Sequence, residues 1–130
     1  MAKRVKPAKV APPPGCESFP ELLAFLGHKH VLAILWALSV KSPRRFSEIE
    51  AETGISPRSL SARLVDFERN GLLTRRSYDE RPPRVEYTLT PKGRALVPIF
   101  ETLNEWHHSF GTGPFALVPE NTEGPVKGRA

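Results

Sequence analysis

The sequence predicts a small α+β domain that is mostly helical. Short segments with apolar residues at helical spacing are separated by glycine and proline turn signals over much of the chain. A single pair of alternating apolar and polar segments, divided by a proline-containing loop, predicts one β-hairpin in the second half. The length of 130 residues, with 39% hydrophobic and 25% charged residues, provides material for one packed domain.

Both ends of the chain differ in composition from this domain, which we place at residues 16–110. Residues 1–15 carry four basic side chains and a Pro-Pro-Pro-Gly end without apolar periodicity, so we expect a disordered basic tail. Residues 111–130 are rich in glycine and proline, and we expect a flexible C-terminal tail.

The apolar runs and the cysteine content indicate a cytoplasmic protein. The longest apolar run, Val31–Val40, is half the length of about 20 residues that a membrane helix needs. The basic N-terminus is followed by prolines and not by the apolar core of a secretory signal. The single cysteine, Cys16, excludes an internal disulfide and suits a reducing compartment.

The first two predicted helices are apolar. Cys16–Leu26 has apolar residues at helical spacing and is ended by Gly27. Lys29–Leu38 is apolar nearly all round and is therefore expected at the centre of the fold. A basic turn, residues 42–45, follows it.

Two further helices are joined by a tight turn. Ser47 and Glu50 have the spacing of a capping box, which predicts the start of a short third helix that Gly54 ends. Ser56-Pro57 then gives an N-cap and a first-position proline for a fourth helix, which runs to Asn70 and stops at Gly71. This pair matches a helix-turn-helix, although structural bundles also contain such pairs.

The fourth helix has a buried and an exposed side. Leu60, Leu64 and Phe67 fall on one narrow stripe, which predicts the packed side. The opposite side carries Arg58, Ala62, Asp66 and Arg69, flanked by Ser59 and Arg63. A helix of about 10–12 Å diameter fits the major groove of B-form DNA, so these small, polar and cationic groups suit base contacts.

A hairpin with a basic edge follows. Leu72–Ser77 and Val85–Leu89 are predicted strands, joined by a loop stiffened by two prolines. The loop arginines, Arg81 and Arg84, are expected to be held outward to meet DNA phosphates, and the strand adds Arg75 and Arg76. Between Gly54 and Arg94 the chain holds nine basic and five acidic residues, an asymmetry that attracts phosphate.

The last predicted helix begins at Thr90-Pro91 and carries a long apolar stripe of Leu96, Ile99, Leu103, Trp106 and Phe110. Burial against a second copy of the chain is favoured over folding back on the same domain, because large apolar patches usually mark interfaces. Pro98 is expected to kink this helix. With the first helix, the predicted dimer contacts are Phe19, Leu22, Leu96, Ile99, Leu103 and Trp106.

Several blocks resemble the HxlR-type winged helix-turn-helix transcriptional regulators, close relatives of the MarR group. They are Arg45-Phe46-Ser47-Glu48-Ile49, Gly54-Ile55-Ser56-Pro57, Leu64 through Gly71-Leu72, and Pro82-Pro83-Arg84-Val85-Glu86-Tyr87 with Leu89-Thr90. The resemblance spans about residues 16–106 and makes the hairpin a wing and the terminal helices dimerisation helices. It implies a homodimer that binds an operator in double-stranded DNA and controls neighbouring genes. Because two copies of the fourth helix would contact half-sites about 34 Å apart, we expect the operator to be a pseudo-palindrome.

The residues expected to contact DNA lie on the third and fourth helices and the wing: Arg45, Ser56, Pro57, Arg58, Ser59, Ala62, Arg63, Arg81 and Arg84. The alternative is a winged-helix protein-interaction module that does not bind DNA. Cations on both the helix and the wing (Arg58, Arg63, Arg81 and Arg84) favour the DNA-binding hypothesis, since an interaction scaffold does not need them.

Other chemistry has weaker support in the sequence. Cys16, at a predicted helix start, is a candidate redox or electrophile sensor, because helix amides stabilise a thiolate; the adjacent Glu17 opposes this, and an inert thiol is the alternative. The histidine pairs, 28/30 and 107/108, do not require a metal site. No enzyme motif occurs, and we expect no catalytic residue, cofactor or metal.

Overall fold

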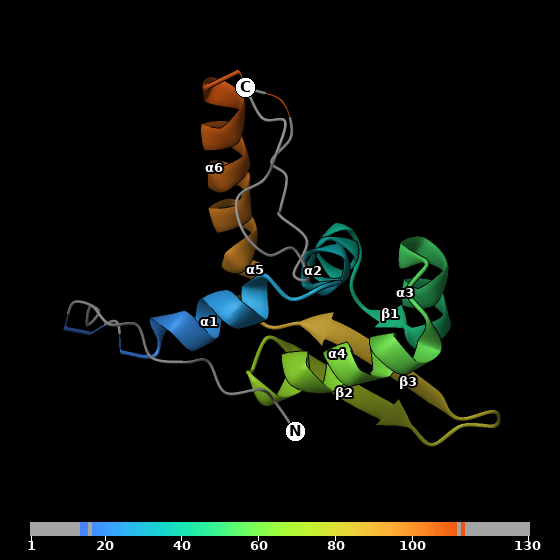
Figure 1. The fold of residues 1–130 in the computed structure, drawn as a ribbon. Coiled ribbons are helices and arrows are strands. Elements are labelled where there is room, and N and C mark those ends of the chain that lie inside the picture. The colour runs from blue at the N-terminus through green and yellow to red at the C-terminus, as the bar shows by residue number, and fades with distance from the viewer. Residues whose placement is uncertain (1–13, 16, 112, 114–130) are drawn as a thin grey trace, which may run out of the picture.

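The computed structural model describes residues 14, 15, 17–111 and 113. Its helices and strands are α1 (Phe19–Leu26), α2 (Val31–Val40), β1 (Arg44–Arg45), α3 (Phe46–Thr53), α4 (Pro57–Arg69), β2 (Leu73–Tyr78), β3 (Arg84–Leu89), α5 (Pro91–Arg94) and α6 (Leu96–Ser109). Figure 1 shows α6 standing away from the body of the fold, whereas the β2–β3 hairpin extends in another direction. The mostly helical α+β winged fold predicted from the sequence is confirmed.

The structure agrees with the predicted helices, with shifted starts. α1 begins at Phe19, three residues after the predicted start at Cys16, which lies outside the described residues. α2 begins at Val31, because the preceding His30 takes a left-handed backbone conformation with φ of 79° that a helix cannot continue through. Five α2 residues are buried, as its apolar composition predicts: Val31, Ile34, Leu35, Ala37 and Leu38.

No single helix in the described part of the chain is long and apolar enough to cross a membrane. Only α1 and α2 together reach that length and composition, and the chain bends by 75° between them.

The predicted capping box of α3, Ser47 with Glu50, is wrong, because the helix begins earlier than predicted. The helix begins at Phe46 and its N-cap is Arg45, not Ser47. The carboxylate of Glu48 accepts a hydrogen bond from the Arg45 backbone N–H at 2.8 Å. An arginine side chain has no acceptor, so this helix start has only the glutamate half of a capping box.

A three-stranded antiparallel sheet in the order β1-β3-β2 forms the wing and its base. The hairpin pairs Leu73 with Leu89 and Tyr78 with Arg84. β1 pairs Arg44 with Tyr87 and Arg45 with Glu86. The sequence predicts a basic turn at residues 42–45, but Arg44 and Arg45 form a short strand instead. The strand forms because the edge of β3 lies beside these two residues and pairs with them.

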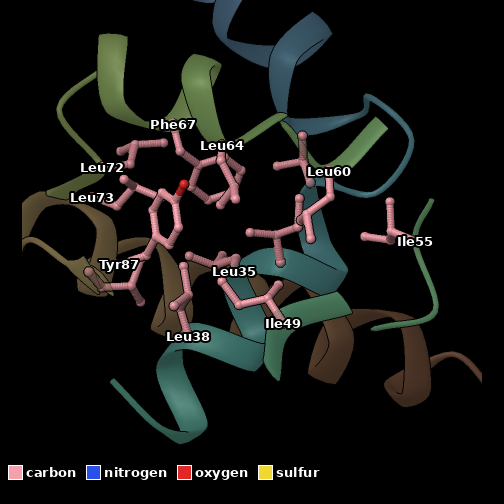
Figure 2. Packing of buried hydrophobic residues seen from close by; sticks show 13 residues of the cluster. Leu35, Leu38, Ile49, Ile55, Leu60, Leu64, Phe67, Leu72, Leu73 and Tyr87 are labelled. Atoms are coloured by element: carbon pink, nitrogen blue, oxygen red, sulfur yellow. The ribbon is translucent and has the colours of Figure 1, made fainter. Parts of the chain in front are cut away.

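The core lies between α2, α3, α4 and the base of the sheet (Figure 2). Leu60, Leu64 and Phe67, the predicted seam of α4, are buried there. The Phe67 ring meets Phe25 of α1 edge to face at 5.6 Å between ring centroids, which joins α1 to the core. The core therefore fixes α4 by one side and leaves its other side to solvent.

Candidate nucleic-acid interface

The turn before α4 positions the start of that helix. Gly54 has φ of 71° and ends α3 in the left-handed conformation, which glycine adopts without steric cost. Buried Ile55 then anchors the turn in the core. Ser56 caps α4 by accepting a hydrogen bond from the backbone N–H of Ser59 at 3.4 Å, and Pro57 occupies the first helical position.

The exposed side of α4 differs in part from the predicted side. Pro57, Arg58 and Ala62 are exposed as expected, but Ser59 and Asp66 are half-buried. Ser61 and Val65 are exposed instead, Val65 by 44%. On a helical wheel Arg58, Ala62, Val65 and Arg69 lie opposite the buried seam of Leu60, Leu64 and Phe67. The wheel therefore accounts for the exposure of Val65, whereas Ser61 lies at one side of this exposed strip.

Arg63 does not have the free position that the sequence predicts. Its side chain is only 19% exposed, and its guanidinium lies 3.3 Å from the carboxylate of Asp66, one turn further along α4. This ion pair offsets the positive charge of Arg63 and holds its side chain at the edge of the packed seam. Of the predicted α4 cations, Arg58 is therefore the one placed in the first turn of the exposed strip.

Arg84 also departs from the prediction that the loop prolines hold it outward. Its Nε lies 3.1 Å from Glu80 and 3.9 Å from Glu86, and its guanidinium stacks 4.0 Å above the Tyr78 ring. The side chain is 27% exposed. The two carboxylates offset its charge, and the ring holds it against the hairpin. This wing cluster of Tyr78, Glu80, Arg84 and Glu86 is invisible in the sequence pattern, because strand pairing brings Tyr78 opposite Arg84.

The remaining wing cations are exposed. Arg81, Arg75 and Arg76 all face solvent, and Arg76 lies 5.0 Å from the Tyr78 ring centroid. Arg45 is exposed at the start of α3, in register with Glu86 on β3. Its neighbour Arg44 is buried, and its Nε donates to the carbonyl of Lys41 at 3.1 Å. Of this consecutive pair, only Arg45 is available to a ligand.

The junction between α4 and α5 ties α4 to the wing. Thr90 caps α5 by accepting from the Gly93 N–H at 3.1 Å, as its position predicts, and donates to the carbonyl of Gly71 at 2.6 Å. Lys92 Nζ donates to the carbonyl of Asn70 at 2.9 Å. The Thr90–Gly71 and Lys92–Asn70 hydrogen bonds fix the end of α4 against the residues that follow β3.

The predicted apolar stripe is exposed over most of its length. Phe19, Leu22, Ile99, Leu103 and Trp106 are all large apolar side chains open to solvent in the single chain. Leu96 differs: it is half-buried and packs against the domain's own core. The predicted C-terminal helix is interrupted at Ala95, between α5 and α6. In a continuous helix the carbonyl of Arg94 would accept a hydrogen bond from the backbone N–H of residue 98, and Pro98 has no N–H.

Two apolar grooves border α6. The α1–α6 groove, of about 420 Å³, is lined among others by Leu22, Phe25, Leu96 and Ile99. The α2–α6 groove, of about 470 Å³, is lined by Leu32, Trp36, Phe100, Glu101, Leu103, Asn104, Trp106 and His107. The sequence predicts that α2 lies at the centre of the fold and gives no sign that Leu32 and Trp36 are exposed.

The histidines have local roles. His30 is the N-cap residue of α2, and His28 Nδ1 lies 3.1 Å from the carbonyl of Lys29. The rings of His107 and His108 have centroids 5.6 Å apart. Among the described residues, no three His, Cys, Asp or Glu side chains are grouped so as to hold a metal ion.

Comparison with known proteins matches residues 25–113 to the family of the HxlR-like helix-turn-helix. An HTH-type transcriptional regulator of Halalkalibacterium halodurans is 40% identical over 85 residues, which are 65% of this chain and 75% of that protein. Among solved structures, the reduced transcriptional regulator YodB of Bacillus subtilis aligns with a TM-score of 0.67 and 33% identity, over 74% of this chain and 94% of YodB. YodB has also been solved in diamide-treated and quinone-bound forms.

The redox regulator HypR, in its reduced form, aligns with a TM-score of 0.59 and 34% identity, over 70% of this chain and 90% of HypR. The family match covers α2 to α6, the turn before α4 and the hairpin described above. The chain therefore belongs to the HxlR-like helix-turn-helix family and is a DNA-binding transcriptional regulator with a winged fold.

Proposed function

We propose that this regulator acts as a homodimer on a pseudo-palindromic operator, with one α4 in the major groove of each half-site. The observation that carries the proposal is the strip Arg58, Ser61, Ala62, Val65 and Arg69, which stays exposed while the opposite side of α4 is buried in the core. A helix held by one side and free on the other is the arrangement that recognition helices share.

The chemistry of the strip suits base edges. Arg58 lies in the first turn, where recognition helices approach bases, and a guanidinium pairs with guanine O6 and N7. Ser61 and Ala62 are small enough to let the helix backbone come close. Val65 offers an apolar surface for a thymine methyl group.

The wing contributes phosphate contacts in this proposal. Arg81, exposed at the hairpin loop, is the principal contact, and Arg75, Arg76 and Arg45 add positive charge around it. Arg84 serves a different purpose from the one the sequence predicts: its contacts with Glu80 and Tyr78 shape the hairpin that presents Arg81.

The second copy is proposed to bind along α1 and α6. Leu22 and Ile99 border the α1–α6 groove, and Phe19 and Trp106 extend the apolar surface on either helix. An exposed surface of this kind is buried in a C2 dimer by the same surface of the partner. Two α4 helices then meet half-sites about 34 Å apart, one turn of DNA.

Selection of bound DNA from a random pool tests the operator. We expect an inverted repeat with one-turn spacing. Arg58→Ala is expected to lose about 1–3 kcal/mol on the selected site and to relax one base preference. Arg69→Ala, the same charge change at the far end of α4, is the control and is expected to keep the base preference. Selection of no consensus would favour the protein-interaction alternative.

Sedimentation of full-length variants tests the dimer. Ile99→Glu places a charge in the proposed contact and is expected to give monomers at micromolar concentration, because burying an unpaired carboxylate is costly. Val40→Glu, also at an exposed apolar position but on α2, is the control and is expected to stay dimeric. Dimers of Ile99→Glu would place the interface elsewhere.

We further propose that Cys16 gives the regulator a redox or electrophile response. It is the chain's only cysteine, so a thiol reagent has one target per chain. The diamide-treated and quinone-bound forms of YodB and the oxidised form of HypR support this proposal by similarity. Operator titration with and without a thiol-directed electrophile tests it, with Cys16→Ser as control. Unchanged affinity for the operator after confirmed modification of Cys16 would contradict the proposed response.

A further inference from the structure

The three strands of the wing sheet carry much more positive than negative charge. They contain two arginines in β1, two in β2 and one in β3, but a single acidic residue, Glu86. Glu86 lies on β3, the middle strand of the sheet, and its side chain is 19% exposed. A carboxylate at the centre of a basic surface lowers the positive potential that this surface presents to DNA phosphates. Phosphate binding alone gives no reason for a negative charge at this position.

The strand register places Glu86 between two arginines. Glu86 pairs with Arg45 of β1 on one side and with Arg76 of β2 on the other. Residues directly opposite each other in an antiparallel sheet point to the same face, with Cβ atoms about 4.5–5.5 Å apart. Arg45, Glu86 and Arg76 therefore form a row across the sheet in which a carboxylate lies between two guanidinium groups. Opposite charges in such cross-strand pairs attract each other.

This row lies on the outer face of the sheet, which points away from the core. The next residue of β3, Tyr87, is buried in the core, so Glu86 points to the opposite side. Arg84, two residues before Glu86, shares the outer face, and its Nε lies 3.9 Å from the Glu86 carboxylate. The Cζ atoms of Arg76 and Arg84 both lie over the Tyr78 ring, at 5.0 and 4.0 Å from its centroid, which agrees with this placement. Glu86 is thus the shared neighbour of three arginines.

The Glu86 carboxylate occupies a position that a phosphate would otherwise favour. A guanidinium group pairs with carboxylate and phosphate oxygens in the same geometry, so either anion suits the space between Arg45 and Arg76. With Glu86 in that space, a DNA phosphate that approaches the centre of the outer face meets a like charge. Phosphate contacts are therefore confined to cations at the rim of the sheet, such as the exposed Arg81 in the hairpin loop.

We propose that Glu86 is a specificity-determining residue, which takes the place of a phosphate between Arg45 and Arg76 and so keeps sequence-independent binding by the wing weak. Binding to random DNA depends almost entirely on phosphate contacts, whereas binding to an operator also depends on base contacts by α4. A carboxylate on the outer face therefore weakens binding to random DNA more than binding to the operator. The operator part rests on the proposed function, whereas the effect on random DNA requires only that the chain binds DNA.

The salt dependence of binding to random duplex DNA tests this role in the full-length protein. Glu86→Gln keeps the size of the side chain and removes its charge. It is expected to steepen the slope of log affinity against log salt by about one, the value of one added phosphate contact. The loss of affinity between about 50 and 200 mM salt then grows by about 3.5-fold. Glu86→Asp keeps the charge and is expected to have the parental slope.

Three controls separate this effect from a general change in charge or stability. Glu105→Gln makes the same charge change at an exposed position on α6, which extends away from the hairpin (Figure 1), and is expected to leave the slope unchanged. In an Arg45→Ala/Arg76→Ala background, Glu86→Gln is expected to change the slope much less, because the cations that it would free are absent. Thermal denaturation measures stability: a Glu86→Gln variant with a lower Tm and the parental slope would reduce Glu86 to a structural ion pair and overturn the proposal.

A second measurement leaves Glu86 in place and so does not depend on the folding of its variants. Arg76→Ala is expected to reduce the salt slope by less than Arg81→Ala does, because Glu86 already offsets the charge of Arg76. Equal reductions by the two variants would overturn the proposal.

Titration on a site selected from a random DNA pool measures the specificity itself. Glu86→Gln is expected to raise the affinity for random DNA by more than the affinity for the selected site, so the ratio of the two affinities falls. An unchanged or increased ratio would overturn the proposal. If the selection gives no consensus, the proposed operator fails, whereas the slopes on random DNA still decide the role of Glu86.

Discussion

Gly93 offers a sharp test of how the wing and the recognition helix are joined. It is buried in the first turn of α5, where a Cβ atom would lie 2.2 Å from the carbonyl oxygen of Leu72 and 3.0 Å from a methyl of Leu89. That oxygen would have to retreat by about 1.2 Å to reach the 3.4 Å of an ordinary contact. It also accepts a hydrogen bond from the Thr90 N–H at 3.0 Å, which such a movement disturbs.

Gly93→Ala is therefore expected to destabilise the domain. Overpacking costs about 1–3 kcal/mol, and a weakened hydrogen bond adds about 0.5–1.5 kcal/mol. The better helix propensity of alanine offsets up to about 1 kcal/mol. The net loss of about 1–3 kcal/mol in the free energy of unfolding corresponds to a fall in Tm of roughly 5–20 °C for a domain of this size.

Thermal denaturation followed by circular dichroism measures this loss, with two other glycines as controls. Gly113→Ala meets no atom within 4 Å and is expected to change the free energy of unfolding by less than about 0.5 kcal/mol. Gly54→Ala has equal space but φ of 71°, so it is expected to lose about 1–2 kcal/mol from backbone strain alone. A Gly93→Ala variant that melts at or above the parent temperature would refute the close contact.

Three further predictions concern the wing, the start of α3 and the core. Arg81→Ala is expected to reduce the slope of log affinity against log salt by about one, and Arg84→Ala by less, because carboxylates already offset its charge; equal reductions would contradict the wing cluster. The Arg45 N–H, followed by Lys41, lowers the pKa of Glu48, so Glu48→Gln is expected to destabilise at neutral pH. The stability difference between the parent and Glu48→Gln is present above the unfolded pKa of about 4.3 and is lost as pH falls through the lower folded pKa. A stability difference that persists in acid would contradict the role of the Glu48 carboxylate. Phe67→Ala is expected to lose about 3–5 kcal/mol in urea unfolding, and a loss below 1 kcal/mol would contradict its place in the core.

The sequence by itself determines the local features of this protein. Glycine and proline act on their own backbone, so the turn at Gly54, the cap at Ser56 and the N-cap at Thr90 are predictable without any knowledge of the fold. Helical spacing likewise determines the buried seam of α4, since Leu60, Leu64 and Phe67 are neighbours on any helix. The same wheel places Arg58, Ala62, Val65 and Arg69 on the side opposite the seam, whereas the exposure of Ser61 and the partial burial of Asp66 depend on the fold.

Tertiary structure decides the features that depend on partners distant in the chain. Arg44 and Arg45 form a strand because β3 lies beside them, and Arg84 turns inward because strand pairing brings Tyr78 opposite it. The close contact at Gly93 arises from a carbonyl twenty-one residues earlier, and no local pattern records it. The physical reason is that packing and ion pairing depend on distances between elements, whereas propensity and periodicity describe only the residues within one element.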